Sequence, residues 1–411
     1  MSALQIEVEA EAVGMSSERL ARIDRHFQRF IDDQRLAGWQ IVVARHGKIV
    51  HSSVAGQRDM KAGLPVQDDT IWRIFSMTKP ITAVLALQLW EEGAFELNDP
   101  VHQFIPSFKD TKVWRGGSVT NPVLDPMVEP MKLWQLFAHT AGLTYGFMYA
   151  HPVDDLYRRA GFEWGTPGDH DLAGVCDVLA GLPLLFQPGS EWNYSMGLDV
   201  LGRVLEVVSG KPLDVLLRER LLDPLGMHDT TWFVPEEHQG RLAELYGAHP
   251  VSSQAIPLTQ MGDAAKRPPK IFGGGGGLQS TAGDYQRFMQ MLAGGGELDG
   301  VRILSPRTVR FMASNHLPNG VDLTAFGRPL FSETTFDGVG FGLGVSVTID
   351  PVKGRVPGNA GEYAWGGAAS TAFWIDPTDD LTVGFYTQLL PSSVHPIRSQ
   401  LKQLVYQSFL D

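Results

Sequence analysis

The chain has 411 residues, of which 43% are hydrophobic and 19% charged, enough for one large domain or about two to three ordinary ones. Its formal net charge is −12 and it has no basic cluster, which argues against nucleic acid or an anionic membrane as a partner. The single cysteine, Cys176, excludes an intrachain disulfide, and its apolar surroundings predict a small buried hydrophobe.

The N-terminal part predicts a helix followed by a hairpin and a strand. Apolar residues recur at helical spacing over 16–33 and favour an amphipathic helix. Apolar or alternating runs at 39–44 and 49–54 flank a polar turn, which is typical of a β-hairpin. A further strand is expected over 70–74.

An apolar run with helical spacing follows that strand and ends at Gly93. Pro80 fixes where this helix begins, because proline lacks an amide hydrogen and is tolerated only in the first turn. The helix should therefore begin near Ser76, which places this hydroxyl at the positive end of the helix.

The middle of the chain reads as a mainly helical insertion. Prolines and glycines punctuate the stretch from 94 to 190, where short helical pieces are expected at 131–137, 154–159 and 171–180. An amphipathic helix is predicted over 197–209 and another over 212–222.

Strand signals return after Thr230 and continue to the C-terminal helix. A five-glycine run at 273–277 precedes a helix at 282–292, and a short helix begins at Ser305-Pro306. Strands are expected at 340–349, 370–375 and 381–387, and an amphipathic helix at 396–409. The two ends, 1–90 and 230–411, should therefore form one α+β domain with an antiparallel sheet flanked by helices, and 91–229 a mainly helical domain.

Ser76 and Lys79 are three residues apart at a predicted helix start, so their side chains should be neighbours on one face. Desolvation disfavours the charged ammonium form of a lysine, and the neutral amine that results suits a base for a serine nucleophile. The alternative is a buried structural lysine. The four-residue pattern is weak alone, because it recurs at Ser399 and Lys402, where a solvated helix face is expected.

Two distant segments strengthen the catalytic interpretation. Tyr194 follows Pro188-Gly189 and precedes the predicted helix at 197–209, and Trp365-Gly366-Gly367-Ala368 leads into a strand. With Ser76-x-x-Lys79, this order resembles the penicillin-binding protein and class C β-lactamase superfamily, which carries Ser-x-x-Lys, Tyr-x-Asn and Lys-Thr-Gly. Further segments that look like landmarks of that family are 139–143, 224–227 and 274–281.

The resemblance implies a β-lactamase-like fold with the active site in the cleft between the two domains. It also has two departures. Met196 stands where the lactamases have asparagine, and Trp365-Gly366-Gly367 replaces Lys-Thr-Gly, so the cation that holds an antibiotic carboxylate is missing. Both changes look like family VIII carboxylesterases, and an apolar tryptophan and methionine favour uncharged acyl or alkyl groups.

The mechanism implied by the resemblance is acyl transfer through an acyl-enzyme on Ser76. Lys79 and Tyr194 would share the proton transfers, and the backbone amides of Ser76 and Ala368 would hold the oxyanion. Trp365, Gly366, Gly367 and Met196 would line the substrate site. An aromatic-rich stretch is expected to form either an acyl-pocket wall or ordinary core: Tyr145, Phe147, Met148, Tyr149, Phe162 and Trp164.

We therefore expect a serine carboxylesterase for short-to-medium acyl esters. A β-lactamase or D,D-peptidase, an acyltransferase with the same acyl-enzyme, and a catalytically silent binding protein are the alternatives. Neither a metal site nor a cofactor is implied, and the expected partner is a small-molecule ester. The acidic N-terminus lacks the apolar core of a secretory signal, so a cytoplasmic location is expected; the oligomeric state, a homo-oligomer included, is left open.

Overall fold

The computed structural model of the chain describes residues 4–168, 170–328 and 336–410. Its main sheet has eight strands in the order β12-β13-β14-β15-β16-β1-β2-β3, and all its pairings are antiparallel. The strands are β1 (Gly38–Arg45), β2 (Lys48–Asp59), β3 (Leu64–Pro65), β12 (Val339–Phe341), β13 (Ser346–Thr348), β14 (Tyr363–Gly366), β15 (Ala372–Asp376) and β16 (Leu381–Tyr386). Because β1 pairs with β16, the two ends of the chain build one sheet, and the predicted antiparallel α+β fold is confirmed.

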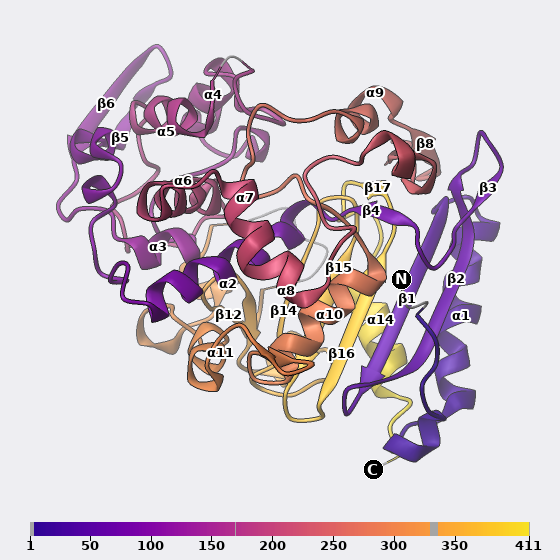
Figure 1. The fold of residues 1–411 in the computed structure, drawn as a ribbon. Coiled ribbons are helices and arrows are strands. Elements are labelled where there is room, and N and C mark those ends of the chain that lie inside the picture. Colours follow the sequence, from indigo (N-terminus) through magenta and orange to yellow (C-terminus); the bar gives the residue numbers. More distant parts are fainter. Residues whose placement is uncertain (1–3, 169, 329–335, 411) are drawn as a thin grey trace.

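Helices cover both faces of this sheet (Figure 1). Successive side chains of a strand point to opposite faces. Ile41 and Val43 of β1 pack in one apolar cluster with α1 (Ser17–Asp32) and α14 (Ile397–Tyr406). Val42 packs on the other side, in the cluster that contains α10 (Ala282–Ala293) and α2 (Thr78–Glu91). Helix α2 is buried from Thr78 to Leu89, as expected for a helix that is apolar on all sides.

The segments of the middle of the chain gather beside α2, away from α1 (Figure 1). They are α3 (Leu133–Phe137), α4 (Pro152–Arg159), α5 (Leu172–Ala180), α6 (Gly197–Ser209) and α7 (Leu213–Leu217). One apolar cluster runs from these helices to the sheet, joining for example Leu201 and Phe373. The division into domains at 90 and 230 stays a prediction, because the core passes through both parts.

Three expectations need correction. The predicted strand at 340–349 is two strands, β12 and β13, joined by a turn that contains Gly344 with a φ of 88°. The predicted helix at 212–222 is α-helical only to Leu217 and continues as a π-helical turn. The middle stretch also holds a hairpin, β5 (Lys112–Ser118) and β6 (Asn121–Pro126), whose largely exposed residues give no alternating apolar pattern.

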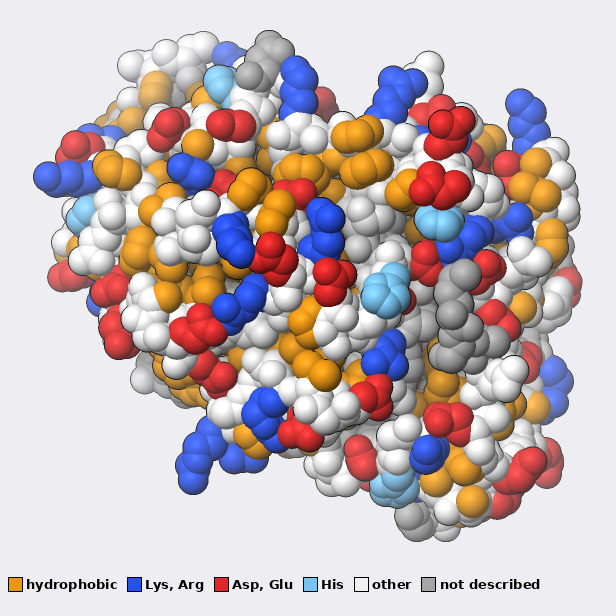
Figure 2. Space-filling view, in the orientation of Figure 1, with side chains coloured by type: hydrophobic (Ala, Val, Ile, Leu, Met, Phe, Trp, Pro, Cys, Tyr) orange, Lys and Arg blue, Asp and Glu red, His pale blue; other side chains and the backbone are white. Residues whose placement is uncertain are grey.

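The strand expected at 70–74 is β4 (Ile71–Arg73), but it pairs with β9 (Gln279–Thr281) outside the main sheet. The remaining elements are β7 (Tyr246–Ala248), β8 (Ala255–Pro257), β10 (Glu297–Leu298), β11 (Val301–Arg302), β17 (Leu389–Leu390), α8 (Asp223–Leu225), α9 (Thr259–Gly262), α11 (Pro306–Met312), α12 (Leu323–Phe326) and α13 (Pro351–Gly354). Within the described ranges no helix is both long and apolar enough to cross a membrane. On the face drawn in Figure 2, acidic and basic side chains are interspersed.

Candidate active site

Ser76 lies in a single 3-10 turn, Phe75–Met77, directly before α2. Phe75 has a φ of 43°, a conformation that costs free energy in a non-glycine residue and is often found at functional sites. The turn places the Ser76 hydroxyl at the start of α2, as Pro80 predicts. Negative charge that develops on this oxygen is favoured by the helix end.

Lys79 and Tyr194 both contact the Ser76 hydroxyl. The Lys79 Nζ lies 3.2 Å from Ser76 Oγ, and the Tyr194 hydroxyl donates to the same oxygen at 2.5 Å. Lys79 is buried, donates to the Gly275 carbonyl at 2.6 Å, and lies 4.6 Å from the centre of the Tyr194 ring. The three predicted catalytic side chains therefore converge on one oxygen, an arrangement that permits proton transfer from Ser76.

The segment after β14 packs against the Ser76 turn. A Cβ atom added to Gly367 would lie 2.5 Å from the Ile74 carbonyl oxygen, so only glycine allows this approach. Within the described part of the chain, no hydrogen-bond acceptor is found for the Ala368 amide, which follows Gly367. This amide is therefore available for an oxyanion beside Ser76.

Two cavities meet at Ser76, and Phe147 and Ala368 also line both. The larger, about 730 Å³, is lined by Tyr194 and by the predicted residues Trp365, Gly366 and Gly367. The smaller, about 410 Å³, is lined by the predicted residues Met196, Tyr145, Phe162 and Trp164. Met148 and Tyr149 line neither of these two cavities, and Tyr149 is 62% exposed.

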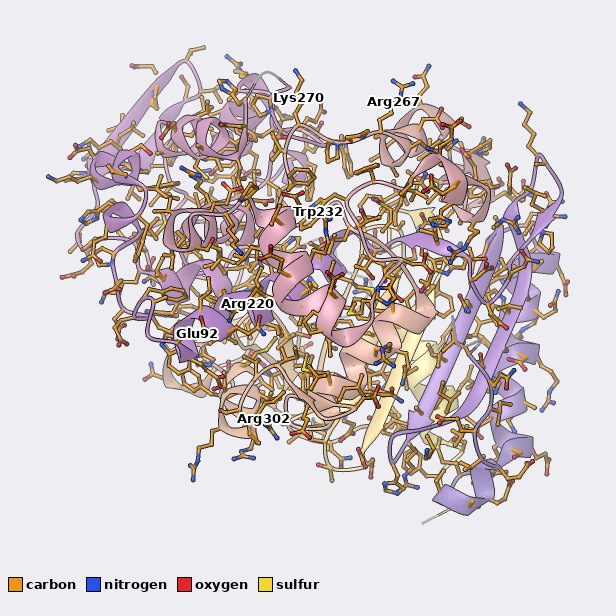
Figure 3. All side chains as sticks on the ribbon, in the orientation of Figure 1. Glu92, Arg220, Trp232, Arg267, Lys270 and Arg302 are labelled. Atoms are coloured by element: carbon orange, nitrogen blue, oxygen red, sulfur yellow. The ribbon has the colours of Figure 1, made fainter. Side chains whose placement is uncertain are left out.

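The aromatic stretch forms a stacked series that starts at Tyr194. The Tyr145 ring lies 5.3 Å from Tyr194 and stacks on Phe147 at 4.7 Å, and Phe147 stacks on Trp164 at 5.0 Å. Within this series Phe147 borders both cavities, whereas Tyr194 lines only the larger one and Tyr145 and Trp164 line only the smaller one. Trp232, labelled in Figure 3, donates to the Gly273 carbonyl at 3.1 Å and holds the glycine run against the smaller cavity.

Two buried titratable residues next to these groups were not predicted as functional. Burial lowers the pKa of His139 well below its usual value, and the charge of Lys79 lowers it further. The His139 ring lies 4.9 Å from the Tyr194 ring, and its Nδ1 pairs with Ser195 Oγ at 3.0 Å. Burial also raises the pKa of Asp199, while Lys79 opposes that shift.

The sequence carried a signal for each of these two residues. His139 belongs to the segment 139–143, which was treated only as a landmark. Asp199 stands in the first turn of the apolar helix α6, where an acidic residue is ordinarily explained by the helix dipole.

The second Ser-x-x-Lys pair lines the larger cavity, and the helix face that was expected to be solvated is only partly exposed there, with the Lys402 side chain 19% exposed. Lys402 forms an ion pair with Glu362, whose side chain is 1% exposed, and Tyr406 donates to Glu362 at 2.8 Å. Ser399 Oγ donates to the Pro396 carbonyl at 3.2 Å. Among the described residues, no hydrogen bond is found between the side chains of Ser399 and Lys402.

Comparison with known proteins adds an independent finding. The Beta-lactamase family matches residues 23–407 of the chain. An uncharacterized protein of Mycobacterium tuberculosis is 37% identical over 360 residues, covering 87% of this chain and 86% of that protein. Esterase EstB of Burkholderia gladioli is 31% identical over 403 residues, covering 94% of this chain and 95% of that protein. The solved structure of EstCE1, described as a hydrolase with promiscuous acyltransferase activity, has a TM-score of 0.78 at 26% identity and covers 95% of this chain and 99% of its own.

Proposed function

The chain belongs to the beta-lactamase family, and we propose that it is a serine carboxylesterase that forms an acyl-enzyme on Ser76. It is a serine hydrolase with a β-lactamase and penicillin-binding-protein-like fold, and its relatives include esterases. The observation that carries the proposal is the contact of Ser76 Oγ with both Lys79 and Tyr194 where two cavities meet.

The proposed cycle has two steps. Ser76 Oγ attacks the ester carbonyl while its proton passes to Lys79 or Tyr194, and the tetrahedral oxyanion is held by the amides of Ser76 and Ala368. Collapse expels the alcohol, which takes up a proton, and leaves the acyl group on Ser76. Water then attacks the acyl-enzyme by the reverse proton transfers and releases the acid.

The two cavities suggest which part of the ester goes where. A proton donor to the leaving alcohol must lie on the side from which the alcohol departs. Tyr194 lines the larger cavity, so we place the alcohol there and the acyl group in the smaller cavity, beside Met196. The smaller cavity is mostly apolar in its walls, which suits short-to-medium acyl chains.

Two observations favour esters over β-lactam antibiotics. Trp365 occupies the position of the lysine that holds the antibiotic carboxylate in the lactamases, and its ring packs 5.5 Å from Tyr194. Met196 occupies the position of the lactamase asparagine and is buried in the wall of the smaller cavity. A substrate carboxylate would thus lose its lysine partner.

Acyl transfer to an alcohol is the second candidate. A cavity of about 730 Å³ beside Ser76 has room for an acceptor alcohol in place of water, and EstCE1 is described as having promiscuous acyltransferase activity. Added alcohol should then divert part of the acyl group from acid to new ester. Product analysis at increasing alcohol concentration measures this partition.

The experiment for the main proposal is hydrolysis of p-nitrophenyl esters from acetate to decanoate. We expect wild type to hydrolyse the esters of short and medium chain length. In Ser76→Ala, kcat/KM should fall by a factor on the order of 10³ or more. A fluorophosphonate should label wild type and Ser399→Ala equally, and not Ser76→Ala. Equal ester hydrolysis by wild type and Ser76→Ala would refute the acyl-enzyme, and faster turnover of a chromogenic cephalosporin than of any ester would favour the lactamase.

A further inference from the structure

Asp199 is a buried carboxylate in the wall of the smaller cavity that the proposed cycle does not use. It lies in the first turn of α6, three residues after Met196, which directly precedes the helix, and both residues line this cavity. Its Oδ1 accepts a hydrogen bond from the Gly275 amide at 2.9 Å. A Cβ atom added to Gly275 would lie 2.3 Å from the Oδ2, so the glycine run leaves room for this carboxylate.

The carboxylate is connected to Lys79 through one peptide unit. The Gly275 amide donates to Asp199, and the Gly275 carbonyl accepts from Lys79 Nζ at 2.6 Å. Among the described residues, the only donors found for the Asp199 side chain are the Gly275 amide and its own backbone amide. The hydrogen-bonding capacity of Oδ2 is therefore left to whatever enters the cavity.

The other buried charge in this wall, Arg73, already has partners within the protein. Arg73 donates to the Ala243 carbonyl at 2.5 Å and to the Gly262 carbonyl at 2.6 Å. Much of the remaining lining is apolar, including Phe162, Met196, Ile271 and Leu278. Asp199 is thus the buried carboxylate that faces an otherwise largely apolar binding space.

The chemistry of the space selects one class of acyl group. An unsubstituted alkyl chain would displace water from the carboxylate and leave it without a donor, which is unfavourable for a buried charge. An acyl carboxylate would be repelled by Asp199, and an acyl ammonium would lie close to Lys79. A neutral hydroxyl satisfies the carboxylate without either repulsion.

We propose that Asp199 is an acyl-recognition residue that accepts a hydrogen bond from a hydroxyl on the acyl chain, so that the preferred substrates are esters of hydroxy acids. The inference rests on the proposed function, because it places the acyl group in the smaller cavity. It makes Asp199 a determinant of substrate choice and leaves bond making and breaking to Ser76, Lys79 and Tyr194.

The test compares p-nitrophenyl butyrate with each enantiomer of p-nitrophenyl 3-hydroxybutyrate on wild type, Asp199→Asn and Asp199→Ala. The readout is the ratio of kcat/KM for the hydroxy ester to that for the plain ester, which cancels the intrinsic reactivity of each ester between variants. We expect the ratio for one enantiomer to fall about tenfold in Asp199→Ala, and less in Asp199→Asn, because the amide keeps hydrogen-bonding capacity.

Glu163→Gln is the matched control, because Glu163 is an exposed carboxylate at the border of the same cavity. It should leave the ratio unchanged. If the role of Asp199 is purely structural, its substitution would lower kcat/KM equally for both substrates. The ratio would then stay as in wild type for both enantiomers, which would overturn the inference. That result is distinct from failure of the proposed function, in which Ser76→Ala would retain the wild-type rate on the plain ester.

Discussion

The two Ser-x-x-Lys pairs of this chain have the same spacing, and Ser76, Ser399 and Lys402 line the larger cavity, but the surroundings of the two pairs differ. Lys79 contacts Ser76 Oγ and a backbone carbonyl. Lys402 instead pairs with the carboxylate of Glu362, and Ser399 bonds to a backbone carbonyl. The first pair joins its serine to its lysine, whereas the second binds each side chain to another group.

The two lysines differ in the group that holds the ammonium nitrogen. Lys402 is held directly by a carboxylate, in an ion pair with Glu362. Lys79 is buried and donates directly to the Gly275 carbonyl, the Asp199 carboxylate is connected to it through the Gly275 peptide, and the serine lies within reach. The four-residue pattern is common to both pairs, so the partner of the lysine separates them.

The largest expected effect tests this contrast on the two lysines. Lys79→Ala should lower kcat/KM for p-nitrophenyl butyrate by about 10³-fold, because the Ser76 proton loses an acceptor, while the protein stays folded. Lys402→Ala should keep kcat within a few-fold of wild type. A loss of activity of the same size in both variants would break the comparison.

For stability the order should reverse, with Lys402→Ala the more strongly affected of the same two variants. Removing Lys402 leaves the buried Glu362 carboxylate without its cation, which we expect to lower the free energy of unfolding by about 3 kcal/mol. Urea unfolding followed by circular dichroism measures this change. If Lys402→Ala is as stable as wild type, the ion pair contributes nothing, and the contrast between the regions would rest on activity alone.

Two tyrosines give the next comparison. Tyr194→Phe removes the hydroxyl that donates to Ser76 Oγ, and we expect kcat to fall about 10²-fold with little change in KM. Tyr406→Phe removes a hydroxyl that bonds to Glu362 and Asp376 beside the second pair, so it should lower stability by about 1 kcal/mol without that loss of kcat. Steady-state kinetics and urea unfolding of both variants decide between these outcomes.

A further prediction concerns the amide that would hold the oxyanion. A methyl group at Gly367 would meet the Ile74 carbonyl and Thr371 Oγ1, so Gly367→Ala should displace Ala368 and lower kcat by about tenfold or more. Gly240→Ala is the control, since no atom lies within 4 Å of its added Cβ. An unchanged kcat and an unchanged rate of fluorophosphonate labelling would show that this amide has no part in catalysis.

The sequence allowed the architecture to be predicted because its signals are local. Apolar periodicity located the helices at 16–33 and 197–209 closely, and Pro80 located the start of α2. The hairpin of β5 and β6 was missed because its exposed residues carry no apolar alternation, and β4 was assigned without its true partner, β9. Pairing between distant segments has no local signature.

The site shows the same limit. Ser76, Lys79 and Tyr194 were identified by motif spacing and resemblance, and the structure brings them together. The division of the site into two cavities was not predicted, because it depends on how distant residues such as Phe147 and Ala368 come together in three dimensions. Asp199 was missed for a similar reason, since its relation to Lys79 passes through the backbone of Gly275, far away in the sequence.

The smallest expected effect concerns His139, which packs against Tyr194 beside the first pair. The carboxylate of Glu362 contacts Lys402 of the second pair, whereas His139, which is neutral and fully buried, packs against Tyr194 beside the first pair. Burial depresses the folded-state pKa of His139, so the unfolded chain binds a proton that the folded chain does not as the pH falls below about 6.5. The stability contributed by neutral His139 is therefore present above that pH and is lost below it, by about 1 kcal/mol between pH 6.5 and 5.5.

His139→Asn should make the free energy of unfolding less dependent on pH between 6.5 and 5.5, and should lower it at pH 7.5. Asparagine is chosen because it tolerates the positive φ of 56° at position 139. His46→Asn is the matched control, because His46 has a φ of 52° on an exposed turn and the variant keeps the buried His139, so the loss of stability below pH 6.5 should remain. Urea unfolding of the three proteins at pH 7.5, 6.5 and 5.5 makes the comparison. If the His139→Asn and wild-type profiles run parallel, protonation of His139 does not limit the acid stability of the Tyr194 side of the cavity, and its contact with Tyr194 is one of packing only.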